Sequence, residues 1–190
     1  MFKLPNEMME MKALEVLNLG ENNFQPSKWP MFLSELTELT YLAMRQMAMT
    51  GSIPNTILYL SNLKFLDVKG NQLTGSLPED MIKLNDLEVL LIEQNDITGN
   101  ANVVCQSSSH ISNQTAVATF VADCDQKDLE STLVIQCDCC TTCCRKSETD
   151  CNEDPEKPVF WLDAYDAPQY YNGRNEKYSP YPTMYDDSDF

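Results

Sequence analysis

The residues with the most chemistry to offer are eight cysteines, all in the short block from Cys105 to Cys151 of this 190-residue chain. An even number of cysteines in a compact block is typical of a disulfide-stapled module in an oxidising compartment. We therefore expect disulfides, and their pairing stays open among 105 connectivities. The cysteines concerned are Cys105, Cys124, Cys137, Cys139, Cys140, Cys143, Cys144 and Cys151.

Two other uses of this block need to be weighed. Cys140-x-x-Cys143 and its neighbours could supply thiolates to zinc, but zinc sites usually arise from two separated pairs. Here six of the eight cysteines crowd into fifteen residues and include vicinal pairs, which favours disulfides over a metal site. A thiol-redox role is the other alternative, and it requires an exposed thiolate of low pKa, which a sequence cannot show.

The residues that enzymes use most do not form a catalytic pattern. His110 is the one histidine, and it follows Ser107-Ser108-Ser109 in a serine-rich loop where a serine–histidine pair is usually incidental. Neither a Gly-x-Gly-x-x-Gly motif nor a phosphate-binding Gly-Lys-Ser loop occurs. We interpret the carboxylates of Glu88, Glu93 and Asp67 as solvated residues on a surface. The sequence predicts neither an enzyme nor a cofactor.

Charge and hydropathy limit the partners and the location. The formal net charge of −16 repels phosphate backbones and anionic lipids, so nucleic acid and membrane surfaces are excluded as electrostatic partners. No run reaches the roughly 18 apolar residues of a membrane helix, and Met1 is not followed by an apolar signal core. The cysteines and the glycosylation sequon at Asn113 favour an extracellular or cell-surface protein, with the cytoplasm as the alternative.

The elements that position these residues come from an internal repeat. The pattern Leu-x-x-Leu-x-Leu-x-x-Asn-x-Leu begins at Leu14, Leu39, Leu63 and Leu87, at intervals of 25, 24 and 24 residues. Such a period indicates a repeat architecture, in which Leu-x-Leu forms a short strand with its leucines turned inward. The asparagine amide of each repeat is expected to bond backbone groups of adjoining turns. Three repeats carry this asparagine, and Met47 replaces it in the other.

The second half of each repeat has its own signature. A proline at position 5, 30, 54 or 78 is followed by apolar residues three, six and nine positions later. This spacing suits a helical or 3₁₀ return segment on the convex side. Thr50-Gly51-Ser52-Ile53-Pro54 and Thr74-Gly75-Ser76-Leu77-Pro78 are near copies, with the glycine permitting a backbone bend.

Residues Leu63 to Pro78 closely resemble the plant-type leucine-rich repeat with its Leu-Thr-Gly-x-Ile-Pro signature, known from receptor-like ectodomains and secreted microalgal proteins. The resemblance covers a little over half of the chain. It implies an α/β repeat fold, a right-handed solenoid with a parallel concave β-sheet, and a ligand-binding or adhesive role without a particular ligand. The dense cysteines after Asp123-Cys124 resemble the C-terminal module of diatom-type members.

Three regions follow from these patterns. Residues 1–104 form a solenoid of about four coils that starts in the middle of a repeat, and residues 105–151 form a cysteine-rich cap. Residues 152–190 are an acidic tail rich in tyrosine and proline, which we expect to be disordered. The apolar edge at Leu4, Met8, Met11 and Leu14 has no cap. We hypothesise that the chain is a fragment or that this edge pairs with another molecule.

Residues that alternate with the strand leucines are expected on the concave face, in rows across the coils. Exposed aromatic residues often mark interfaces, which makes this face the candidate binding site. Its residues are Tyr41, Arg45, Phe65, Asp67, Lys69, Val89, Leu91 and Glu93.

The predicted function of this face is recognition of a protein, peptide or glycan. Alternatively, the aromatic residues only stabilise the sheet, or the cysteine-rich segment folds over them. Two other roles remain open, namely a structural or assembly spacer without a discrete ligand and a cytosolic cysteine-rich metal-binding adaptor.

Overall fold

The computed structural model describes residues 3–105, 117–124 and 135–144, which all belong to the unit Met1–Cys151. The expectations for the sequon at Asn113, for Cys151 and for the tail at 152–190 lie outside the described residues.

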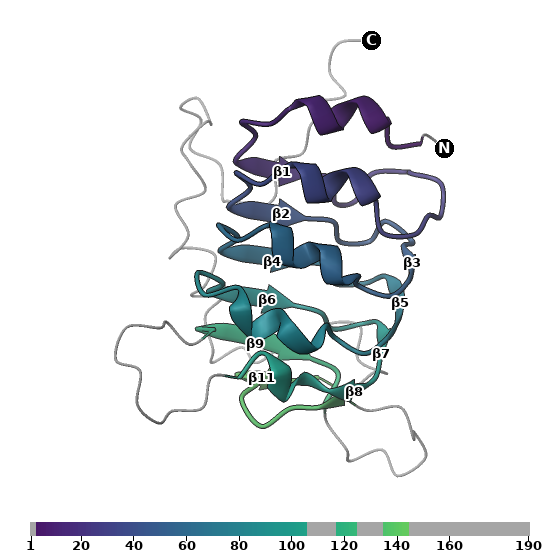
Figure 1. Ribbon diagram of the computed structural model, residues 1–190. Helices are drawn as coiled ribbons and strands as arrows, with labels where there is room; N and C mark the ends of the chain where they lie inside the picture. The colour runs from purple at the N-terminus through teal and green to yellow at the C-terminus, as the bar shows by residue number, and fades with distance from the viewer. Residues whose placement is uncertain (1–2, 106–116, 125–134, 145–190) are drawn as a thin grey trace, which may run out of the picture. The chain divides into compact units, whose positions relative to one another are not determined.

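A parallel sheet of six short strands runs through this unit, as the repeat predicts (Figure 1). Its strands are, in spatial order, β1 (Val16–Asn18), β2 (Tyr41–Ala43), β4 (Phe65–Asp67), β6 (Val89–Leu91), β9 (Thr119–Ala122) and β11 (Thr142–Cys143). The central leucine of each repeat pairs in register with the next, so Leu17, Leu42, Leu66 and Leu90 form one buried row. The next member of that row is Phe120, which is fully buried.

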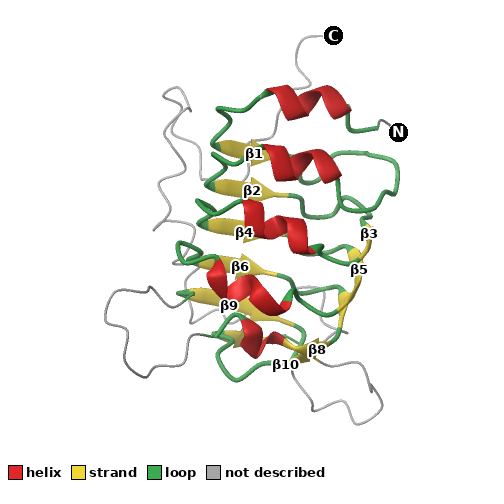
Figure 2. Ribbon diagram, in the orientation of Figure 1, coloured by secondary structure: helices red, strands yellow, loops and turns green. Residues whose placement is uncertain are grey.

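A 3₁₀ turn follows the repeat proline of each coil and lies on the side opposite the six-stranded sheet (Figure 2). The turns are η1 (Asn6–Glu10), η2 (Met31–Glu35), η3 (Asn55–Tyr59) and η4 (Glu79–Lys83), and a shorter η5 (Ala101–Val103) follows them. The residue three positions after the proline donates its N–H to the proline carbonyl, as Ile57 does to Pro54 at 3.1 Å. This bond closes one 3₁₀ turn, which explains why the apolar residues recur every three positions.

A second strip of parallel strands lies where the Thr-Gly motifs stand. It comprises β3 (Thr50–Gly51), β5 (Gln72–Gly75) and β7 (Asp96–Ile97), while β8 (Gly99–Asn100) pairs with β10 (Ile135–Gln136). The glycines at 51 and 75 have φ of +81° and +78°, a conformation that side chains disfavour. The bend at these glycines was predicted from the sequence, whereas the strands beside it were not.

A ladder of asparagine amides joins the coils in the core. Asn71 Oδ1 accepts the N–H groups of Met47 and Met49, both at 3.0 Å, and its amide nitrogen donates to the carbonyls of Met44 and Val68. The buried backbone groups of one coil are therefore paired by a side chain of the next. Met44, Met47 and Met49 belong to the core, since each is at most 2% exposed.

The ladder has a different form at its two ends. Asn95 repeats the pattern of Asn71 by bonding Leu73 N and Val68 O. Asn22, in contrast, is exposed, and its amide nitrogen donates only to carbonyls of its own turn, those of Leu19 and Gly20. The expectation that each ladder asparagine joins adjoining coils therefore needs correction for the first repeat.

The cysteine-rich region continues the sheet. After β9, the Asp123 carboxylate accepts the N–H groups of Gln94 and Asn95, each at 3.0 Å. A carboxylate can accept both bonds at once, which makes it a suitable partner for the last ladder position.

Among the described residues, no helix has the length and apolar character needed to cross a membrane.

Candidate functional site

The rows predicted for the concave face are present in the strand register. Tyr41 pairs with Phe65, and Phe65 with Val89. The aromatic rings of Tyr41 and Phe65 stack with centroids 4.3 Å apart and planes inclined by 6°. This stacking follows from the sheet itself, because neighbouring strands lie about 4.8 Å apart and hold side chains of one row parallel.

Charged residues of the site lie beside the aromatic pair. Lys69 Nζ lies 3.4 Å from Glu93 Oε1, and the backbone N–H of Lys69 donates to Asp67 Oδ1 at 3.0 Å. Arg45 forms an ion pair with Glu21. Gly20 lies next to Arg45 on the neighbouring coil. A Cβ atom added at Gly20 would lie 2.9 Å from Arg45 Cγ.

Exposure of the concave face falls from one end of the sheet to the other. In the first row, Val16 is 39% exposed, Tyr41 is half-buried and Phe65 is 3% exposed. Val89 and Leu91, which were predicted as binding residues, are also buried. The accessible part of this face is therefore its β1–β2 end.

The interpretation of Asp67 and Glu93 as solvated surface carboxylates is wrong, because they are 0% and 1% exposed. Burial raises the pKa of Glu93 to about 7, against the lowering effect of the nearby Lys69 ammonium, and the Asp67 charge raises it further. Among the described residues, Glu93 Oε2 finds no hydrogen-bond partner. Burial, followed by the Asp67 charge, likewise raises the pKa of Tyr41 to about 12, so the phenol stays a hydrogen-bond donor.

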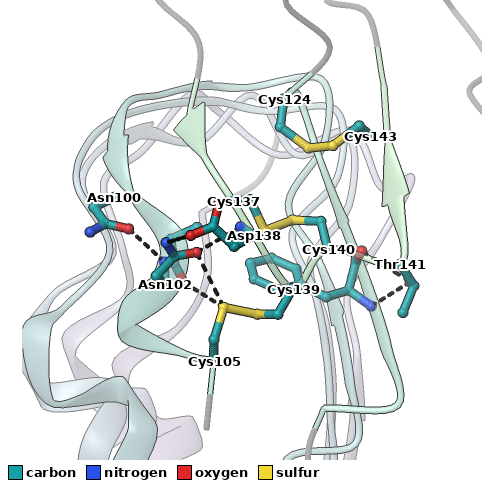
Figure 3. Close-up of a disulfide and its surroundings, with 12 residues drawn as sticks. Asn100, Asn102, Cys105, Cys124, Cys137, Asp138, Cys139, Cys140, Thr141 and Cys143 are labelled. Carbon is teal, nitrogen blue, oxygen red and sulfur yellow. Dashed lines mark hydrogen bonds between the residues drawn. A yellow bond between two sulfur atoms is a disulfide. The ribbon is translucent and has the colours of Figure 1, made fainter. Parts of the chain in front are cut away.

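The disulfides expected from the cysteine count are present among the described residues (Figure 3). Their pairing, which was open, is Cys105–Cys139, Cys124–Cys143 and Cys137–Cys140, with sequence separations of 34, 19 and 3. Cys144 is also disulfide-bonded. Cys140 and Cys143 are both oxidised to disulfides, so they supply no thiolates to a zinc ion. The metal-binding adaptor therefore has no support from this pair.

The three disulfides differ in what they contribute to folding. On loop-closure entropy alone, separations of 34 and 19 correspond to about 4 and 3 kcal/mol, and a separation of 3 to about 2 kcal/mol. Cys124–Cys143 joins the segment after β9 to β11, and Cys105–Cys139 joins the segment after η5 to the loop after β10. The short disulfide lies inside that loop.

Comparison with known proteins supports the fold described above. A model of the Leucine Rich Repeat family matches residues 62–84. The ectodomain of the Arabidopsis receptor kinase HAESA, in complex with an extended IDA peptide hormone ligand, has a TM-score of 0.52 at 29% identity. The match covers 64% of this chain and 19% of the HAESA chain. The chain thus has a leucine-rich-repeat solenoid fold similar to that of a plant receptor ectodomain.

Two other plant protein structures are similar over a shorter stretch. A plant ice-binding protein is 26% identical over 52% of this chain and 32% of its own, with a TM-score of 0.49. The ectodomain of the Arabidopsis receptor kinase GASSHO1/SCHENGEN3 is 31% identical over 52% of this chain and 12% of its own, also with a TM-score of 0.49. No curated protein matches. This leucine-rich-repeat chain therefore spans at most about a third of the length of these three structures.

Proposed function

We propose that this leucine-rich-repeat protein is an extracellular recognition module that binds a peptide, or a peptide segment of a protein, on its concave face. The disulfides support this location, since they persist in oxidising compartments. Support for a peptide ligand comes from the similarity to the HAESA ectodomain, whose solved complex contains a peptide hormone.

The observation that carries the proposal is the stacked pair of Tyr41 and Phe65 on a sheet face. One face of each ring is covered by the other ring, and the neighbours of the pair in the same row are Val16 and Val89. In the proposed complex a ligand meets the edge of the Tyr41 ring and its hydroxyl, because Phe65 is buried. A sugar that stacks on an aromatic residue needs a free ring face, so this arrangement favours a peptide over a glycan.

The polar residues of the site extend the same contact surface. The phenol of Tyr41 donates a hydrogen bond over the whole physiological pH range because of its raised pKa. The Arg45 guanidinium, whose side chain is 14% exposed, adds donors for carbonyl or carboxylate oxygens of the ligand. In the proposed complex Tyr41 and Arg45 are supported from the buried side of the row. The supporting residues are Phe65, Asp67, Lys69 and Glu93.

Selection from a random-peptide display library on the immobilised protein tests the proposal. Replacing Tyr41 by alanine is expected to weaken binding of the selected peptides at least about fivefold, because an aromatic anchor at an interface is typically worth more than about 1 kcal/mol. Tyr59→Ala is the matched control, since that tyrosine is 61% exposed on η3, opposite the sheet. It should leave the affinity unchanged.

Three outcomes separate the candidate functions. Peptides that lose affinity in the Tyr41 variant and keep it in the Tyr59 variant support concave-face recognition. Equal affinity for both variants places the contact elsewhere. A library that yields no enriched peptide favours the spacer without a discrete ligand. Circular dichroism and the thermal midpoint of each variant establish that the fold is retained.

A further inference from the structure

One disulfide of the cap differs from the others in its place in the chain. Cys137 and Cys140 are joined across a Cys-x-x-Cys segment, Cys137-Asp138-Cys139-Cys140, and the structure places both in half-buried positions (Figure 3). Their disulfide links no two elements, since the segment between them is a single loop after β10.

The loop is held in place without this disulfide. The Asp138 N–H donates to Asn102 Oδ1 at 2.7 Å, and Asn102 Nδ2 donates to Asp138 Oδ2 at 2.6 Å. Cys139 is tied to Cys105 by its own disulfide. On the other side, Thr141 Oγ1 accepts the N–H of Phe120 at 2.9 Å and donates to its carbonyl at 3.1 Å. Asp138, Cys139 and Thr141 are therefore each held by a contact other than the Cys137–Cys140 disulfide.

The physical consequence concerns reduction. A disulfide that stabilises a fold is itself stabilised by that fold to the same extent, because the two equilibria are linked. The links at separations of 34 and 19 constrain long stretches of chain, whereas the link at a separation of 3 constrains almost nothing beyond its anchored loop. Reduction of Cys137–Cys140 therefore frees the shortest stretch of chain and leaves the other anchors of the cap in place. Exposure alone does not make this distinction, since Cys143 is exposed.

We propose that Cys137–Cys140 is a redox-modification site, at which an external dithiol reversibly reduces this one disulfide while the other described disulfides stay intact. A thiolate of the dithiol attacks one of the two sulfurs and forms a mixed disulfide, as the Cys137–Cys140 bond breaks and the departing sulfur takes up a proton. The second thiol of the dithiol then attacks the mixed disulfide. The products are two cysteine thiols and the oxidised dithiol, so two electrons and two protons have passed to the protein.

The anchors make the reaction reversible. Because the Asp138–Asn102 hydrogen bonds and the Cys105–Cys139 disulfide remain after reduction, the two new thiols stay near one another. An oxidant of the disulfide class closes them again without reordering the cap.

Stepwise reduction of the native, full-length protein with dithiothreitol, followed by alkylation and peptide mapping, tests the site. We expect Cys137 and Cys140 to be labelled together at a dithiothreitol concentration about tenfold or more below that which labels Cys105, Cys139, Cys124 or Cys143. Labelling of the long-range pairs first, or of all pairs at the same concentration, would overturn the proposal.

Two variants examine the role of the anchor. Asn102→Ala removes both hydrogen bonds to Asp138, whereas Asn100→Ala removes only the bond from the Asn102 N–H to the Asn100 side chain at 2.8 Å. After selective reduction, closure by oxidised glutathione should be several-fold slower in the Asn102 variant than in the Asn100 variant. Equal rates would contradict the anchoring, and the labelling order of the wild-type protein decides the site itself.

Discussion

Replacement of Asn71 by alanine is expected to lower the free energy of unfolding by about 4 kcal/mol. The substitution removes the acceptor of the Met47 and Met49 N–H groups and the donor to the Met44 and Val68 carbonyls. These backbone groups lie in the core, and a buried polar group without a partner costs about 1 to 3 kcal/mol. Urea unfolding followed by circular dichroism measures the loss.

The matched control for this substitution is Asn22→Ala. Asn22 holds the same place in its repeat, but it is exposed and its amide nitrogen bonds carbonyls of its own turn only. Water replaces these bonds, so the expected loss is below about 1 kcal/mol. Losses of similar size in the two variants would contradict the assignment of Asn71 as the residue that joins the coils.

The second large effect concerns Glu93 and pH. Its pKa of about 7 in the folded protein lies above the ordinary value of 4.5, so the folded state holds the proton more tightly than the unfolded chain. The stability that comes from this proton is fully present below pH 4.5 and is lost as pH rises through 7. The shift corresponds to about 3 kcal/mol. Glu93→Gln removes the charge, so it should raise the stability relative to wild type by up to about 3 kcal/mol at pH 8.

Urea unfolding of wild type and Glu93→Gln at pH 4.5 and at pH 8 measures this difference. The two proteins should differ much less at pH 4.5, where the wild-type carboxyl is protonated in the folded state. Glu79→Gln, at an exposed position on η4, controls for the general loss of one negative charge. A pH dependence that is equal in all three proteins would show that Glu93 is not desolvated.

The repeat made most of the fold predictable. A recurrence every 24 or 25 residues places the leucines in one row, and rows in a parallel sheet follow from stacking identical coils. The same logic placed Tyr41 beside Phe65 and Lys69 beside Glu93. The boundary of the solenoid at residue 104 stays a prediction, although the sheet continues beyond it into β9 and β11.

Other features depend on contacts that no local pattern encodes. A strand residue in an outward position is exposed or buried according to what packs against it, and so the burial of Asp67 and Glu93 was missed. Disulfide pairing depends on distances between segments far apart in the chain, as with Cys105 and Cys139. Asp123 accepts backbone N–H groups of the preceding coil, as Asn71 does, although it stands two residues closer to its strand than the ladder asparagines. Its place directly after an apolar stretch was the available signal.

Site-specific photocrosslinking shows whether a peptide binds at the concave face. A benzophenone amino acid is placed at position 41 in one protein and at position 59 in another, and each is irradiated with a selected peptide. Peptide binding to the concave face predicts a covalent adduct from position 41, on the sheet face, and none from position 59, on η3. An adduct from position 59 alone would contradict it.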